Sequence, residues 1–116
     1  VLPSLKGKLD GTAIRVPTPN VSLIDFTLVT KKDVTVDSIN NTMTNAAQVE
    51  LKGILGINQK PLVSKDFNHD SHSSIFDVTQ TQVIKGKFTR VLSWYDKEWG
   101  FSNRMCDTAI QISKLI

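Results

Sequence analysis

The chain has 116 residues, enough for one domain with a hydrophobic core. Hydrophobic residues make up 40% of it and charged residues 22%, which is ordinary for a soluble globular protein. The formal net charge is +3, but the basic residues are scattered and no apolar run approaches the roughly 20 residues that span a bilayer, so we expect neither a nucleic-acid nor a membrane partner. The single cysteine excludes an internal disulfide and fits a reducing compartment.

The first half of the chain predicts two strands and a helix. Residues 12–16 form the first predicted strand, which ends where Pro17-Thr18-Pro19 stiffens the backbone and removes two amide donors. Residues 21–30 predict a stronger strand, apolar on both faces, so we expect the sheet to be covered on both sides there. Thr35 is a candidate N-cap and Asp37 suits the positive end of a helix dipole. An apolar stripe at helical spacing follows: Val36, Ile39, Met43, Ala46 and Ala47.

The second half predicts shorter strands and a closing helix. The predicted strands are residues 51–57, 62–67, 74–78, 79–84 and 88–95. The last two form a hairpin across Lys85-Gly86-Lys87, where Gly86 can take a positive φ. The final helix is indicated by apolar residues at helical spacing: Phe101, Met105, Ala109, Ile112 and Ile116. The fold class is therefore α+β, with an antiparallel or mixed sheet, a covering helix and a C-terminal helix.

Arg15 is the most informative residue of the first predicted strand. An arginine among apolar residues needs a partner, because an unpaired buried charge is costly. Beside the stiff Pro17-Thr18-Pro19 turn its guanidinium is pre-aimed, and its fork of donors suits a phosphate or a carboxylate. The alternative is a structural ion pair with Asp25 or another carboxylate. The residues alone favour the ion pair.

Three other features of the sequence invite a chemical role. The segment from Asp66 to His72 contains carboxylates and histidines, but it lacks a third ligand at a recognised spacing, so we expect a turn and no metal site. Cys106 lies beside the apolar stripe of the final helix, which favours a packed, unreactive thiol. The charged corner Asp96-Lys97-Glu98 stands between the last strand and this helix, a common place for a protein to hold a ligand.

Four motifs together resemble glyceraldehyde-3-phosphate dehydrogenase. They keep the order and spacing of that family and extend from Val1 to the last helix. They are Arg15-Val16-Pro17-Thr18-Pro19-Asn20-Val21-Ser22, Leu51-Lys52-Gly53-Ile54-Leu55-Gly56, Asp66-Phe67-Asn68 with His72-Ser73-Ser74, and Ser93-Trp94-Tyr95-Asp96 running into Gly100-Phe101-Ser102-Asn103-Arg104. The resemblance covers only the C-terminal part of that enzyme, and the chain starts at Val1 with no initiator methionine, which suggests a piece of a longer protein.

The resemblance implies an activity for the parent protein. Enzymes of this family oxidise glyceraldehyde 3-phosphate with NAD and inorganic phosphate, through a cysteine thioester and a histidine base. The family's cysteine motif, its histidine and its Gly-rich dinucleotide fingerprint have no counterpart here, and Cys106 does not replace the nucleophile. We therefore expect no catalytic residue in this chain and no activity of the fragment alone. The family further implies a cytoplasmic, glycolytic enzyme that forms a homo-oligomer, usually a tetramer, with the missing N-terminal part as a partner.

The resemblance assigns roles to three positions. Arg15 matches the family arginine that contacts a phosphate of the substrate or of the attacking anion. Tyr95 matches a tyrosine that shapes the pocket near the catalytic pair. Lys97 stands where the family has an asparagine that hydrogen-bonds the nicotinamide amide. Because lysine donates but does not accept, it can bond the amide oxygen and not the amide NH₂. Its charge should also weaken NAD⁺ binding relative to NADH.

The resemblance also implies that the chain divides into two structural units. Residues 1–98 would form the C-terminal part of the catalytic domain, and residues 99–116 a helix that in the family packs on the NAD-binding domain. Two alternatives stay open. One is the sister erythrose-4-phosphate dehydrogenase, which the Asn68-His69-Asp70 segment and Glu98-Trp99-Gly100-Phe101 also resemble. The other is a non-catalytic sheet module that serves assembly, since apolar sheet faces favour self-association. The sequence does not decide between NAD and NADP.

Overall fold

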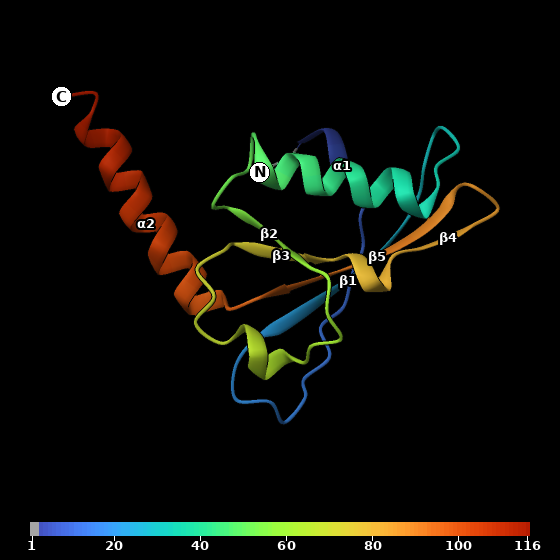
Figure 1. Ribbon diagram of the computed structural model, residues 1–116, viewed down its shortest axis with the longest axis horizontal. Coiled ribbons are helices and arrows are strands. Elements are labelled where there is room, and N and C mark those ends of the chain that lie inside the picture. Colours follow the sequence, from blue (N-terminus) through green and yellow to red (C-terminus); the bar gives the residue numbers. More distant parts are fainter. Residues whose placement is uncertain (1–2) are drawn as a thin grey trace.

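A computed structural model describes residues 3–116 as a mixed sheet with two α-helices (Figure 1). The strands are β1 (Ser22–Val29), β2 (Leu55–Asn58), β3 (Ser74–Asp77), β4 (Gln82–Ile84) and β5 (Phe88–Tyr95). The helices are α1 (Val36–Gln48) and α2 (Lys97–Ser113), with short 3-10 turns at η1 (Pro3–Leu5), η2 (Ser64–Phe67) and η3 (Val78–Gln80). The predicted α+β class is confirmed.

The sheet is organised around β5, which pairs along both of its edges. One edge carries β1, antiparallel and in register from Ser22 opposite Tyr95 to Val29 opposite Phe88. The other edge is shared, because β4 pairs with the first half of β5 and β3 with its end. β2 then joins β3 in parallel, which gives the order β1-β5-β3-β2 with β4 beside β5. The end of β5 is thus held from both sides where the chain turns into α2.

Local chemistry explains the helix α1 and the hairpin. The Thr35 hydroxyl accepts a hydrogen bond of 3.1 Å from the Ser38 N–H, and the Ser38 hydroxyl accepts one of 2.9 Å from the Thr35 N–H. This reciprocal capping box satisfies two N–H groups that the first turn leaves without partners. In the β4–β5 turn, Lys85 and Gly86 have φ values of 50° and 69°, which match the twist of the flanking strands. The predicted N-cap and the predicted positive φ at Gly86 are confirmed.

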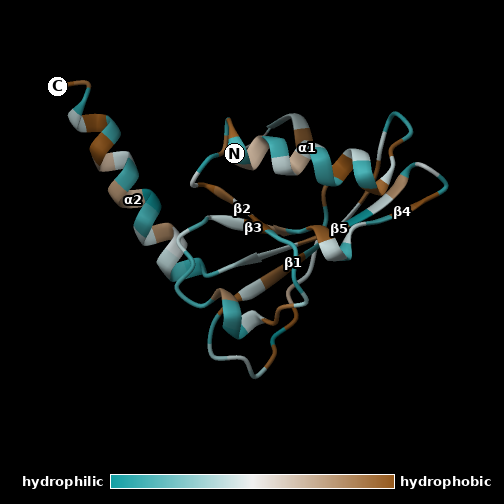
Figure 2. Ribbon diagram, viewed as in Figure 1, coloured by the Kyte–Doolittle hydropathy of each residue, from teal (hydrophilic) through white to brown (hydrophobic). Residues whose placement is uncertain are grey.

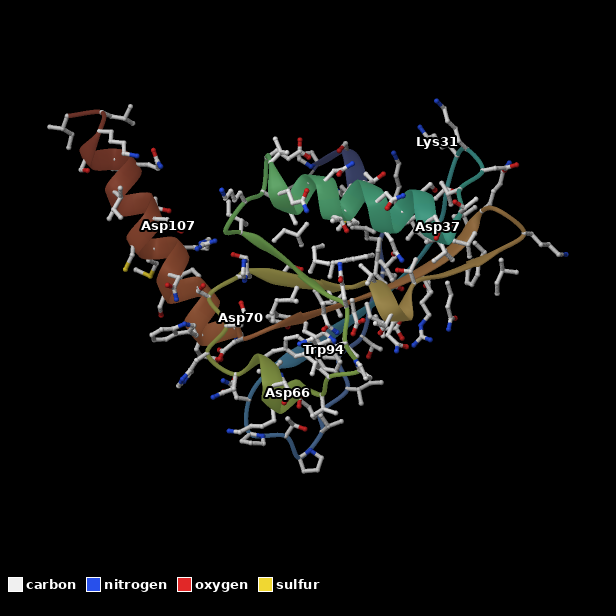
Figure 3. The ribbon with its side chains drawn as sticks, in the orientation of Figure 1. Lys31, Asp37, Asp66, Asp70, Trp94 and Asp107 are labelled. Carbon is white, nitrogen blue, oxygen red and sulfur yellow. The ribbon has the colours of Figure 1, made fainter. Side chains whose placement is uncertain are left out.

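The hydrophobic core lies around Trp94 of β5. Val21, Phe67 and Ile75 form a buried cluster, and Trp94 packs against it with its ring stacked on that of Phe67, the centroids 5.3 Å apart. Asp77 is buried beside them and accepts a hydrogen bond of 2.9 Å from the Trp94 indole. The buried hydrophobic residues are Val21, Leu55, Phe67, Ile75, Phe76 and Leu92. Figure 3 shows Trp94 beneath the middle of the sheet, well away from Lys31 and Asp37.

Two predicted strands are wrong. Residues 12–16 are exposed and irregular, because no strand among residues 3–116 lies beside them to pair with. Residues 62–67 instead contain η2. The carboxylate of Asp66 accepts a hydrogen bond of 2.9 Å from the Val63 N–H, and the Asp66 N–H donates to the Val63 carbonyl at 3.0 Å. These bonds curl the segment into a turn, a known preference of aspartate.

Other predictions need smaller corrections. The strand expected over residues 51–57 begins only at Leu55, after a turn that includes Gly53 at a φ of 76°. The strand expected over residues 79–84 begins only at Gln82, because η3 precedes it. β1 is expected to be covered on both faces, but seven of its eight residues are exposed. Within residues 3–116, no segment buries the apolar side chains of β1.

Helix α2 projects away from the sheet (Figure 1), and the hydropathy colouring of its ribbon shows hydrophobic positions along its length (Figure 2). Phe101 and Met105 are 66% and 59% exposed, and Ile112 is exposed as well. Cys106 is also exposed, so the expected packed thiol is wrong for this chain. Neither of the two helices described in residues 3–116 is long and apolar enough to cross a membrane.

Candidate functional site

The three arginines of the chain differ in what they bind. Arg90 holds Asp25 through two hydrogen bonds, of 2.8 Å from Nε and 2.6 Å from Nη2. Arg104 pairs with Asp107 at 2.6 Å. Arg15 is exposed and forms no ion pair or side-chain hydrogen bond with any of residues 3–116. The ion pair between Arg15 and Asp25, which the residues alone favour, is therefore wrong, and the guanidinium of Arg15 faces solvent.

Lys97 is the first residue of α2 and follows a buried aspartate. Asp96 is only 1% exposed and caps the helix, its Oδ1 accepting a hydrogen bond of 3.1 Å from the Trp99 N–H. Tyr95, the last residue of β5, is half-buried. Lys97 itself is exposed and pairs with no carboxylate in the described part of the chain. Its ammonium group is therefore available at the start of the helix.

Asp96 also collects hydrogen bonds from distant parts of the chain. Its Oδ2 accepts one of 2.9 Å from the Asn20 side-chain amide and one of 2.8 Å from the His69 N–H. The same Asn20 amide donates to Asn68 Oδ1 at 2.8 Å. Burial raises the pKa of Asp96, but the hydrogen bonds from His69, Trp99 and Asn20 outweigh it, so the pKa is lowered. The carboxylate is thus held ionised at the junction of three segments.

This junction relates Arg15 and Lys97, two of the three residues to which the resemblance assigns roles. Arg15 lies five residues before Asn20, and Lys97 directly follows Asp96, so the Asn20–Asp96 hydrogen bond joins the two segments. Sequence reasoning missed both members of this bond. A partial signal exists for Asp96, because an aspartate just before a helical pattern is a favoured N-cap. No local pattern indicates that Asn20 lies against it, since the two are 76 positions apart.

A separate hollow of about 400 Å³ lies between β2 and η2. Its polar side chains already serve the protein: Asp66 caps the Val63 N–H, and Asp70 Oδ1 lies 2.7 Å from His72 Nδ1 and accepts from the His72 N–H at 2.9 Å. Neither Arg15 nor Lys97 lines it. In residues 3–116 no three or more His, Cys, Asp or Glu side chains are grouped so as to hold a metal ion.

Comparison with known proteins bears on this arrangement. The family model described as glyceraldehyde 3-phosphate dehydrogenase, C-terminal domain, matches residues 1–97. The chain belongs to the glyceraldehyde-3-phosphate dehydrogenase family. Relatives with that name are 55% identical over 116 residues in Cereibacter sphaeroides, 58% over 115 in Xanthobacter flavus and 51% over 113 in Geobacillus stearothermophilus. These alignments cover 100%, 99% and 97% of this chain.

The chain spans about a third of the length of the family members it matches. The alignments cover 35% of the Cereibacter sphaeroides relative and 34% of the other two. The matched residues 1–97 include Arg15, Asn20, Asp96 and Lys97, so both sides of the junction lie within the C-terminal domain of the dehydrogenase. The match ends at the first residue of α2, where the chain leaves the sheet.

Proposed function

We propose that this chain forms the C-terminal part of an NAD-dependent, phosphorylating glyceraldehyde-3-phosphate dehydrogenase. In this proposal Arg15 binds a phosphate of glyceraldehyde 3-phosphate or the attacking inorganic phosphate. The observation that carries it is the free guanidinium of Arg15, whose expected partner Asp25 is bound at both oxygens by Arg90. A guanidinium with no partner in the described residues, in a segment stiffened by two prolines, suits a ligand from outside the chain.

The chemistry of the guanidinium supports phosphate in particular. Its planar fork of N–H donors matches two phosphate oxygens at once, and charge-assisted hydrogen bonds are roughly twice as strong as neutral ones. Binding of the phosphate group would hold the aldehyde carbon, or the attacking anion, in a fixed position relative to the thioester that this family forms. Proximity of that kind accelerates phosphorolysis.

Lys97 is the proposed contact to the cofactor. NAD supplies the acceptor for the hydride that leaves the aldehyde carbon. The residue fits in part, because its ammonium is exposed and unpaired within the described residues and can donate to the carboxamide oxygen of the nicotinamide. It cannot accept from the carboxamide NH₂, so the orientation of the ring would rest partly on other groups.

We further propose the division into residues 1–98, in the catalytic domain, and residues 99–116, a helix that packs on the NAD-binding domain. The exposed Phe101 and Met105 of α2 support this division, as does the end of the family match at Lys97. The parent enzyme would be cytoplasmic and homo-oligomeric. The fragment alone would be inactive, because the cysteine nucleophile and the histidine base would come from the N-terminal part.

The test compares the whole protein that contains this chain with the 116-residue chain. NADH should form from glyceraldehyde 3-phosphate, NAD and inorganic phosphate only with the whole protein. Its kcat/KM should be higher for glyceraldehyde 3-phosphate than for erythrose 4-phosphate, and the reverse order would favour the sister enzyme. Turnover by the short chain that a Cys106→Ser change abolishes would overturn the proposal.

A second candidate, a module that serves assembly only, is favoured by the exposed strand β1. An edge strand with apolar, uncovered faces tends to associate with other chains. Light scattering of the chain with and without inorganic phosphate separates the two functions. The assembly module would be supported if the chain associates to the same extent with and without phosphate and the whole protein forms no NADH.

A further inference from the structure

We propose that Asn20 is a positioning residue that sets the place of the Arg15 guanidinium relative to the start of α2. The proposal rests on the proposed function, in which Arg15 binds phosphate and Lys97 contacts the cofactor. Asn20 touches neither ligand in this account. It acts through its hydrogen bond to Asp96, the carboxylate that also caps α2 directly before Lys97.

The segment that carries Arg15 has little else to hold it. Residues 10–19 are exposed, and their hydrogen bonds within the described chain are local, from the Gly11 N–H to Asp10 and from the Thr18 N–H to the Val16 carbonyl. Asn20 is the first residue after Arg15 that bonds to a distant part of the molecule. The position of Arg15 therefore depends on how firmly the chain is held at Asn20.

The chain is held firmly there. The two N–H groups of the Asn20 amide serve two acceptors, Asn68 Oδ1 at 2.8 Å and Asp96 Oδ2 at 2.9 Å. The next residue, Val21, is buried in the core cluster and has a φ of 70°. A β-branched residue at positive φ is strained and persists only where its surroundings fix it, which happens most often near functional sites. Pro17 and Pro19 then stiffen the path back to Arg15.

Asp96 links Asn20 to the start of α2, where Lys97 lies. Besides the Asn20 amide it accepts the N–H groups of His69 and Trp99, so it is fixed in place by two other segments. Replacing Asp96 would uncap α2 and disturb both halves at once. Replacing Asn20 removes only the arm that reaches the Arg15 segment and leaves the helix cap. Asn20 is therefore the residue that isolates the positioning effect.

The experiment measures steady-state kinetics of the whole protein that contains this chain. Asn20→Ala should raise the KM for inorganic phosphate by about fivefold or more, because misplacement of a binding group by a fraction of an ångström weakens its contact. The KM for NAD should change by less than about twofold, since the Asp96 cap before Lys97 remains. The matched control is Asn40→Ala, which removes a half-buried asparagine that also makes two side-chain hydrogen bonds, to Val78 and Thr81, away from the site.

A double-mutant cycle separates positioning from general stability. In an Arg15→Ala background the Asn20→Ala change should add nothing to the KM for phosphate, because Asn20 acts only through Arg15. An additive effect would overturn the inference. Asn20→Ser keeps one donor and should give an intermediate KM, which keeps the test valid if Asn20→Ala does not fold.

The outcomes distinguish this inference from the proposed function. An unchanged KM for phosphate in Arg15→Ala would defeat both. A raised KM in Arg15→Ala, combined with equal effects of Asn20→Ala and Asn40→Ala, would defeat the positioning role alone. A raised KM in Arg15→Ala and Asn20→Ala, with Asn40→Ala unchanged, would support both.

Discussion

Asp25 on β1 and Arg90 on β5 are joined by two parallel hydrogen bonds, so each carboxylate oxygen binds one nitrogen of the guanidinium. Arg90 lies opposite Thr27 in the register, and Asp25 is its diagonal neighbour on the adjacent strand. The hydrogen bonds from Arg90 lower the pKa of Asp25 most, burial opposes them, and the charge of Arg90 adds to the lowering. This pair occupies both oxygens of the carboxylate that the sequence suggests as a partner for Arg15.

Removing the pair should leave the phosphate site intact. We expect Asp25→Asn to change the KM of the whole enzyme for inorganic phosphate by less than about twofold, whereas Arg15→Ala should raise it by about tenfold or more through loss of a charge-assisted bond. Stability should change little, because both partners are partly exposed and water screens them. Equal increases in KM for the two variants would mean that Arg15 depends on Asp25 after all.

The Trp94–Asp77 hydrogen bond should matter more for stability. Asp77→Ala would leave the Trp94 indole and the Thr79 N–H and hydroxyl without their acceptor, at a cost of about 1–3 kcal/mol in the free energy of unfolding. Trp94→Phe keeps an aromatic ring against Phe67 and should cost less, about 1–2 kcal/mol. Denaturant unfolding followed by circular dichroism measures both. An unchanged free energy of unfolding in Asp77→Ala would contradict a structural role for the Trp94–Asp77 hydrogen bond.

Acid should destabilise the fold through two buried carboxylates. Burial raises the pKa of Asp77 and of Asp96, but the hydrogen bonds that each accepts outweigh it and hold both pKa values below the ordinary value of an aspartate. As the pH falls below the unfolded-state pKa of Asp77 and Asp96, these two groups bind more protons in the unfolded chain than in the folded chain. The stabilisation is thus present above the unfolded pKa and is lost as the pH falls through the folded one.

Urea unfolding between pH 7 and pH 3 tests this expectation. The free energy of unfolding should decline from about pH 5 downwards, and Asp77→Asn should reduce the size of that decline. Stability that rises on acidification would contradict the assignment of both groups.

The close approach of α2 to the turn after η2 depends on a glycine. A Cβ at Gly100 would lie 2.9 Å from the carbonyl oxygen of His72, a contact too short to keep. We expect Gly100→Ala to destabilise the chain by about 1 kcal/mol or more, with overpacking outweighing the better helix propensity of alanine. Gly11→Ala is the matched control, because a Cβ there meets nothing within 4 Å. In thermal melts, the Tm of Gly100→Ala should be lower than that of Gly11→Ala.

Periodic and local signals predict much of this fold. The apolar run of β1, the strand pattern of β5, the Thr35 cap and the Gly86 turn all depend on residues close in sequence, and each appears in the structure. Residues 12–16 have the composition of a strand but no strand beside them, and pairing is not a local property. The turn at Asp66 shows the reverse case, in which side-chain bonding to the backbone overrides an apolar pattern.

The site is only half visible in the sequence. Arg15 and Lys97 can be singled out by resemblance, because Arg15 opens one motif and Lys97 stands within another at a position where the family has an asparagine. The Asn20–Asp96 bond cannot, because it joins positions 76 residues apart and is set by tertiary packing around the strained Val21. The sequence marks the corner Asp96-Lys97-Glu98 as a place that could hold a ligand, but it does not show that Asp96, its first residue, is almost completely buried.

Among the three arginines, Arg15 alone has no partner within residues 3–116, and we propose that it binds phosphate. The most direct test of this central claim is modification of the whole protein with phenylglyoxal, an arginine-specific reagent, followed by mass spectrometry of the peptides that contain Arg15, Arg90 and Arg104. We predict that Arg15 reacts fastest and that inorganic phosphate slows its modification several-fold while leaving that of Arg90 unchanged. Modification of Arg15 at the same rate with and without phosphate would contradict the account.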